Sequence, residues 1–585
     1  MSGFEIAGVV LGSIPLVISL LEHYQGGLRT IQRLRKYDRE LQSLIRNLRT
    51  EQAKLQNVCE KLLEGLVPLS RIDEMVENPF GDLWSDEEIQ KKIRARLWRS
   101  WGVFEQTAID MNAAIEEMME RLGGKDKASW LDGTSISREL KRMNFTLSRS
   151  AYADIMSTIK DGISSLESLT TTNIELEPPR RLRSRVKLLS VLRGVSSSIY
   201  RAIRSSLTCT CKHDISLRLS SSHGEITPAD DLERVIQSIK FHLALSQSFG
   251  GEDPEADSVK PQSWEEVLIQ ANPIPKISHV HSHAVSACIA KPTGRKRMTV
   301  SFATRSSSSC TTLVETPTTT SLATSLSTSL SGLTLQAKSR SFSGSDSCLK
   351  LCEELKRFLA HGKSLDIFGT IIDRPSLNPR SYNIFLPSIL SFENPSPLQM
   401  VSLRDVLEGQ GDLQPPTYKE RLHLASAIAL SVLQLHNSPW MPPALGSRNV
   451  FFLKRGDSVY YDHAFVMADS PPSQAWAKPS CIIRSPALLA LGILLIELIR
   501  GQTIDSLRTP KEMLDPESSV LADYMTAERL VHDIYQSSSN YASAVRRCIN
   551  QQFKTPDLNL EDDDFCQEVY AGVVALLEED LSYTR

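Results

Sequence analysis

Three side chains able to bind a metal ion stand at alternate positions near residue 210, namely Cys209, Cys211 and His213. In an extended strand alternate side chains share one face, and thiolate and imidazole groups are ligands that zinc prefers. A closed zinc site needs four ligands, and this C-x-C-x-H pattern has no second ligand pair close to it in the sequence. The pattern therefore favours packing over metal binding, and we expect neither a metal nor another cofactor.

A second group of candidate ligands has the same spacing, with His279, His281 and His283 at alternate positions. These histidines adjoin a segment, at about 295–345, that is rich in Ser and Thr and poor in aromatic residues. Such a segment buries too little apolar surface to offset the entropy lost on ordering. We expect a disordered insertion here and solvated histidines beside it.

The first region of the chain, residues 1–175, has the sequence pattern of helices. Apolar side chains recur there at spacings of three, four and seven, which is typical of amphipathic helices. The periodic runs are Leu28–Leu66, Ile89–Leu122 and Ser137–Leu169. Because proline has no amide hydrogen and clashes with the preceding turn, Pro178 and Pro179 predict the end of the last helix. The fold class expected for this region is an all-α bundle.

A mixed pattern follows, and it predicts a multidomain chain with an α+β region after the bundle. After a helix over Val186–Ile203, short runs bounded by turn residues predict strands. These runs are Ile215–Leu219, Phe241–Leu245, Trp264–Gln270, Leu365–Ile372 and Tyr382–Leu386. We expect residues 180–400 to form a lobe with strands and residues 401–585 to form a mainly helical lobe.

Charge and cysteine content limit the class of protein. The 66 Lys and Arg residues nearly cancel 69 Asp and Glu residues, so the whole chain has no field that attracts nucleic acid. Ten scattered cysteines suit a reducing compartment, which predicts a cytoplasmic protein. The uncharged segment Ile6–Leu21 is short for a membrane span and lacks the basic start of a signal peptide.

The segment Tyr418–Phe452 carries a long apolar helix, a loop and a strand-like run, and this outline resembles the catalytic-loop region of a protein kinase. With Asn449 placed on the metal-binding Asn of a kinase, the catalytic Asp falls on Ala444 and the loop Lys on Gly446. A kinase uses that Asp to orient the substrate hydroxyl. The resemblance therefore implies a kinase-like region without its base.

Two further kinase positions complete this comparison. Asp462, thirteen residues after Asn449, falls on the second metal ligand, whereas Gln270 replaces the Lys that contacts the phosphates. A glycine-rich phosphate loop is missing upstream of Gln270 as well. Asn449 and Asp462 remain candidates for binding a nucleotide and its metal, although a turn-capping Asn and a loop Asp are the simpler interpretation.

Two family resemblances accompany these motifs. One group comprises Cys209-Thr-Cys211-Lys-His213, Leu351-Cys352, Leu433-x-Leu435-His436, Pro439-Trp440 and Leu491-Gly492. Over about residues 180–585 this pattern resembles uncharacterised fungal proteins that have a degenerate kinase-like domain. The apolar, Gly-containing start Gly3–Gly12 and its following helices resemble the HeLo-type bundles of fungal incompatibility and cell-death proteins.

These observations predict a pseudokinase-like signalling or regulatory protein that is not an enzyme, with a binding domain joined to an oligomerisation or membrane-directed effector bundle. An atypical nucleotide-binding kinase using Asn449 and Asp462 is one alternative, and a structural scaffold is another. We expect the chain to bind protein partners and no nucleic acid, and assembly into a homo-oligomer is an open alternative. Contact of residues 1–50 with anionic membrane, as a peripheral protein, remains an alternative because basic side chains follow the apolar segment. These are Arg29, Arg33, Arg35, Lys36, Arg39, Arg46 and Arg49.

Overall fold

The structure, a computed structural model, describes residues 3–584 except for twelve internal gaps. The gaps are 29–34, 123–148, 221–223, 225, 248–262, 274–349, 362–367, 375–378, 387–397, 411–412, 470–483 and 513–518. The Ser/Thr-rich segment at 295–345 and His279, His281 and His283 therefore lie outside the described residues.

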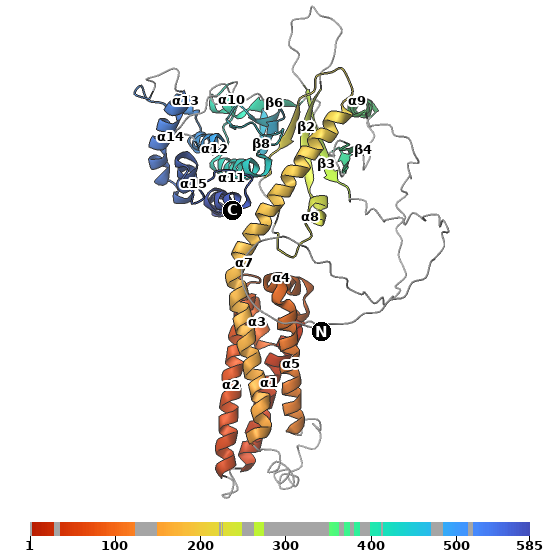
Figure 1. Ribbon diagram of the computed structural model, residues 1–585, viewed down its shortest axis with the longest axis vertical. Coiled ribbons are helices and arrows are strands. Elements are labelled where there is room, and N and C mark those ends of the chain that lie inside the picture. Colours follow the sequence, from red (N-terminus) through yellow and green to blue (C-terminus); the bar gives the residue numbers. More distant parts are fainter. Residues whose placement is uncertain are drawn as a thin grey trace, which may run out of the picture. The chain divides into compact units, whose positions relative to one another are not determined.

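The N-terminal region is helical, as the apolar periodicity predicts (Figure 1). Its long helices are α1 (Gly3–Leu28), α2 (Arg35–Leu63), α5 (Trp101–Arg121) and the first half of α7 (Arg149–Ser206). Short helices connect α2 to α5, namely α3 (Leu69–Glu77), η2 (Asp82–Ser85), α4 (Glu87–Leu97) and η3 (Trp98–Ser100). Apolar side chains from these helices form one continuous core.

Helix α1 is part of that core. Phe4, Ile14 and Leu21 are fully buried, and the ring of Phe4 stacks on Trp84 with centroids 4.6 Å apart. Its small residues make room for rings, since a Cβ on Gly8 would come within 2.6 Å of Trp84. By length and composition Gly3–Glu22 could span a membrane, yet more than half of this segment is buried. In the structure, α1 thus contributes mainly to packing.

Helix α7 corrects one expectation, because it continues through Pro178 and Pro179 instead of ending there. Tertiary contacts around the prolines stabilise the helix against the loss of backbone hydrogen bonds. Just before the prolines, Glu177 forms an ion pair with Arg96 at 2.8 Å; just after them, Arg180 lies over the ring of Trp98. The predicted helix over Val186–Ile203 is thus the second half of α7.

One antiparallel sheet of eight strands follows, in the order β4-β5-β3-β2-β1-β8-β7-β6. The first strands are β1 (Ile215–Arg218), β2 (Lys240–Gln247), β3 (Ser263–Ala271), β4 (Gly369–Ile372) and β5 (Ser381–Phe385). They correspond to the five runs predicted from sequence, of which residues 365–367 lie outside the described residues. The others are β6 (Gln399–Ser402), β7 (Val450–Arg455) and β8 (Ser458–Met467). The register pairs Ile215 with Leu245 and Leu217 with Val466. Strand β1 therefore joins β2–β5 on one side to β6–β8 on the other.

The second half of α7 packs against this sheet and the helices that follow. Tyr382 on β5 donates a hydrogen bond to Ser198 Oγ at 2.6 Å, and Trp440 donates through Nε1 to the Ser196 carbonyl at 2.8 Å. Short helices also lie near the strands, namely α8 (Leu232–Ser238), α9 (Leu351–His361) and α10 (Leu403–Leu407). One core includes side chains of α7, of the sheet and of the C-terminal helices.

The C-terminal region has two buried apolar helices, and the other helices of this region pack around them. These two are α11 (Tyr418–Leu435), which begins with a capping box at Thr417 and Glu420, and α12 (Pro486–Arg500). The rest are α13 (Ile504–Leu507), α14 (Ser519–Tyr535), α15 (Ser539–Asn550), α16 (Asp563–Val569), η5 (Tyr570–Val574) and α17 (Ala575–Ser582). Both α11 and α12 are buried on nearly all sides, as their unbroken apolar sequence predicts.

Candidate functional site

The loop between α11 and β7 holds three of the positions selected by the kinase comparison. Ala444 is buried, and Gly446 and Asn449 form a tight turn. The Gly446 N–H donates to Asn449 Oδ1 at 3.2 Å, and the Asn449 N–H donates to the Gly446 carbonyl at 2.9 Å. Asn449 therefore caps a turn, which is the simpler of the two interpretations of its sequence.

The structure does not bring Asp462 to Asn449. Asp462 is exposed in the middle of β8, whereas Asn449 lies just before β7. Because Val450 pairs with Val466, Asp462 is four residues further along β8 from this pair. At about 3.3 Å per residue this separation is roughly 13 Å, too long for both side chains to bind one metal ion. Gln270, on β3, instead donates to the Gln237 carbonyl at 2.6 Å.

A different acidic residue, Asp469, lies at the same end of the β7–β8 hairpin as Asn449. It lies two residues after the end of β8 and has a left-handed backbone with φ of 55°. Its Oδ2 accepts hydrogen bonds from Tyr200 Oη at 2.6 Å and from Arg204 Nη2 at 2.7 Å, both from α7. Sequence reasoning missed this residue, because the choice between two aspartates seven residues apart depends on where the strand ends.

A pocket beside the Asn449 turn contains a buried carboxyl group. Glu497 on α12 is only 4% exposed, and its Oε1 accepts the Ile504 N–H at 2.9 Å. Burial, reinforced by the nearby Asp505 and Asp523 carboxylates, raises the pKa of Glu497 to about 7. The pocket can therefore hold a proton near neutral pH. Arg508 lies there too and forms an ion pair with Asp505 at 2.9 Å.

A second pocket, which includes Asp462, is lined by residues of β1, β2 and α11. Arg218, Lys240 and His242 contribute to it. Burial lowers the pKa of Arg218, while His242 Nδ1 lies 2.8 Å from a carboxylate oxygen of Glu266. This pocket and the pocket beside Asn449 are lined by different residues, so the two sequence candidates belong to separate surfaces.

Comparison with known families gives one match. Residues 187–584 match a family model described as Domain of unknown function (DUF7580), which covers well over half of the chain. The chain belongs to the DUF7580 family. A search among curated proteins finds no match. The matched region begins inside α7, one residue after Val186, the first buried residue of the core that α7 shares with the sheet.

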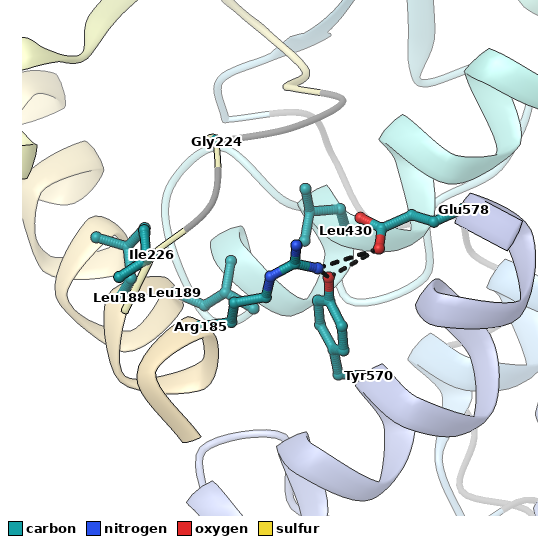
Figure 2. A pocket seen from close by; sticks show the side chains of 8 residues that line it. All are labelled: Arg185, Leu188, Leu189, Gly224, Ile226, Leu430, Tyr570 and Glu578. Carbon is teal, nitrogen blue, oxygen red and sulfur yellow. Dashed lines mark hydrogen bonds and ion pairs between the residues drawn. The ribbon is translucent and has the colours of Figure 1, made fainter. Parts of the chain in front are cut away.

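The segment of α7 just before the DUF7580 region is held to the end of that region by three polar side chains at a small pocket (Figure 2). Arg185 on α7 donates to Tyr570 Oη and contacts Glu578 Oε2 at 3.2 Å. Tyr570 in turn donates to the same Glu578 oxygen at 3.0 Å. Leu188, Leu189 and Leu430 line the pocket as well, as Figure 2 shows. These contacts fix α7 to the last helices of the chain.

The DUF7580 region also assembles the residues with which the sequence analysis began. Cys209, Cys211 and His213 precede β1 in an irregular segment, so the strand expected there is wrong, although their side chains are half-buried and the intervening ones exposed. A fourth side chain joins them from α9, and all four ligand atoms lie within 4.8 Å of one another. We call this group the Cys3His cluster: Cys209, Cys211, His213 and Cys352. Sequence analysis missed the fourth member, which is more than 130 residues away from the others.

Proposed function

We propose that the DUF7580 region is a degenerate, kinase-like binding domain without phosphoryl-transfer activity, and that the helical N-terminus is an effector or oligomerisation module. The separation of Asn449 from Asp462 is the main support for this proposal. A kinase needs its metal ligands on adjacent loops around one phosphate group, with a base next to them. Ala444 cannot act as that base, because its methyl group neither accepts nor donates a proton.

The second candidate function is nucleotide binding through Asn449 and Asp469. Their shared position at one end of the β7–β8 hairpin favours this pair over Asn449 with Asp462. Asp469 already has a cationic partner in Arg204, which supplies the charge that a metal ion would bring. Both partners are partly exposed, so the pair itself is weak and a metal ion could compete with it.

For the bundle, we propose a membrane-directed or oligomerising role that depends on release of α1. The apolar face of α1 is buried, with Phe4 and Leu21 fully enclosed, so it cannot contact lipid while the bundle is closed. Exposed basic residues of α2, Arg39, Arg46 and Arg49, would add attraction to an anionic surface. Arg49 also pairs with Glu22 of α1, which ties the basic helix to the apolar one.

Phosphate transfer from radiolabelled ATP tests the first half of the proposal. The full-length chain with Mg²⁺ and Mn²⁺ should transfer no more phosphate to itself or to a general substrate than a heat-denatured sample does. Phosphate transfer that Asn449→Ala or Asp469→Asn removes, and that Asp462→Ala leaves unchanged, would replace our proposal with the second candidate.

Vesicle sedimentation tests the second half. While the bundle is closed, the exposed basic side chains of α2 should already make full-length protein bind vesicles containing phosphatidylserine more tightly than phosphatidylcholine vesicles, with binding weakened by salt. Arg46→Glu should reduce this binding, whereas Lys91→Glu, an equal charge change at an exposed site outside residues 1–50, should not. If neither vesicle binds and the protein is monomeric at every concentration, the bundle is a scaffold.

A further inference from the structure

The geometry of the Cys3His cluster matches the requirements of a metal centre. Zinc–sulfur bonds of about 2.3 Å in a tetrahedron place two sulfur ligands about 3.8 Å apart. The four ligand atoms of the cluster are all within 4.8 Å of one another, and Cys209 Sγ is 3.0 Å from His213 Nε2. Small side-chain movements would therefore bring all four to a common centre.

The hydrogen bond on the far side of the imidazole is an independent observation that points to a ligand. His213 Nδ1 lies 2.8 Å from the carbonyl oxygen of Ser246 on β2. A carbonyl only accepts, so Nδ1 must carry the hydrogen, and the neutral ring then has its lone pair on Nε2, facing the thiols. Metal-bound histidines are typically oriented in this way by a backbone carbonyl.

The backbone holds that carbonyl firmly in place. Ser246 donates through its N–H to the Asp214 carbonyl at 2.9 Å, and the Asp214 N–H donates to Ser246 Oγ at 2.7 Å. These two hydrogen bonds join the segment that carries His213 to the end of β2. The imidazole is thus positioned before any ligand arrives, which lowers the entropy cost of binding.

We propose that the Cys3His cluster binds one structural zinc ion. Three thiolates and one imidazole are a donor set found in closed structural zinc sites, and soft thiolate ligands select zinc over magnesium or calcium. Four protein ligands leave no open position for water or substrate, so the ion has a structural role and not a catalytic one.

Charge near the cluster agrees with this assignment. Three thiolates around Zn²⁺ leave a net charge of minus one, which a cation close by would stabilise. Lys356, one turn after Cys352 on α9, places its Nζ 4.0 Å from Cys211 Sγ. The same helix therefore supplies one ligand and the compensating charge.

The zinc ion would connect α9 to the start of the sheet. Cys352 is buried in the first turn of α9, whose Leu351 and Leu355 belong to the core shared with the sheet. Residues 213 and 352 are far apart in sequence, and joining them removes conformational freedom from the unfolded chain. We therefore expect metal removal to loosen α9 in particular.

Metal analysis of the full-length protein tests the proposal. Protein purified under reducing conditions with zinc should contain about one zinc ion per chain by mass spectrometry. Cobalt substitution should give the intense visible absorption of tetrahedral cobalt with thiolate ligands. Cys352→Ser and His213→Ala should each lower the zinc affinity at least tenfold, as measured by competition with a chromophoric chelator.

The matched control is Cys548→Ser, since Cys548 is a buried thiol of α15 outside the cluster. It should keep full zinc content. If Cys352→Ser does not fold, Cys211→Ser takes its place, because Cys211 is a half-buried cluster residue in a loop. Two results would overturn the proposal: reduced, folded protein that binds no zinc, or Cys352→Ser protein that keeps zinc at unchanged affinity. A disulfide between two cluster cysteines that persists in protein prepared under reducing conditions with zinc would overturn it too.

Discussion

Glu497 shows at the scale of one residue how burial changes a protonation equilibrium. Its carboxyl group is buried on α12, and burial raises its pKa to about 7, compared with about 4.3 for a free glutamate. The folded state thus binds a proton more tightly than the unfolded state does between these two values. The stabilisation from this proton is complete below about pH 4.3 and is lost as the pH rises through about 7.

Replacing Glu497 by Gln should remove this dependence. Relative to wild type, the free energy of unfolding of Glu497→Gln should rise by about 3 kcal/mol between pH 4.5 and pH 8, since the amide needs no proton. Urea unfolding followed by tryptophan fluorescence, at several pH values, measures this difference. Glu528→Gln, at an exposed carboxyl, is the control. Parallel pH profiles for wild type and Glu497→Gln would show that the buried carboxyl does not titrate in this range.

How far single residues could be predicted from the sequence depends on what positions them. The turn at Asn449 was predictable, since local hydrogen bonds form it. The acidic residue beyond the end of β8 was not, because the sequence does not show that the strand ends between Asp462 and Asp469. Nor was Cys352, whose approach to Cys209 depends on tertiary folding over a long sequence distance.

At the scale of elements, one glycine of α1 and one glycine of α5 give a clear contrast. Alanine has a higher helix propensity than glycine by about 1 kcal/mol, so Gly→Ala should stabilise a helix where space allows. A Cβ at Gly102 on α5 would meet nothing within 4 Å, whereas one at Gly8 would lie 2.6 Å from the Trp84 ring.

We therefore expect opposite results from the same substitution. Gly8→Ala should destabilise the bundle by about 1–3 kcal/mol through overpacking, and Gly102→Ala should leave it unchanged or more stable. Thermal unfolding monitored by circular dichroism measures both. Equal stabilities for the two variants would mean that α1 does not pack closely on Trp84.

The continuity of α7 leads to another prediction. Glu177→Ala leaves the nearly buried Arg96 without its carboxylate partner, although Arg96 still donates to the Leu62 carbonyl at 2.8 Å. A loss of about 2–4 kcal/mol should follow, with faster amide exchange around Pro178 and Pro179. Glu175→Ala, on the exposed side of the same turn, should cost less than about 0.5 kcal/mol. Similar costs for both variants would contradict a structural role of the Arg96–Glu177 pair.

Most elements followed from local patterns, and the exception has a physical cause. Periodicity located the long helices of the bundle, and short runs bounded by turn residues located five strands, because each of these elements contributes to a core. The two prolines were read as a helix end because they lack amide hydrogens. Contacts of Glu177 and Arg180 with residues distant in sequence override this local preference, and the sequence alone does not reveal such contacts.

At the scale of the whole molecule, α7 contributes to both cores. Its first half belongs to the bundle, and its second half, where the DUF7580 match begins, belongs to the core with the sheet. Arg193 on α7 donates to the Leu433 carbonyl of α11 at 2.7 Å, and Arg201 pairs with the fully buried Asp373 at 2.6 Å. A ligand that alters these contacts would act directly on the helix that continues into the bundle. This shared helix is the physical basis for our proposal of a binding domain joined to an effector module.

The most direct test of the proposed non-catalytic function is calorimetric titration of the full-length protein with ATP and Mg²⁺. We predict no binding at millimolar nucleotide, because Gln270 replaces the Lys that contacts the phosphates in a kinase and Asp462 lies too far from Asn449. Arg204→Ala removes the cationic partner of Asp469, leaves its hydrogen bond from Tyr200 and serves as the sensitised variant, while Asp462→Asn serves as the control. Saturable binding of ATP by wild-type protein that requires Mg²⁺ and is lost in both Asn449→Ala and Asp469→Asn would contradict the account.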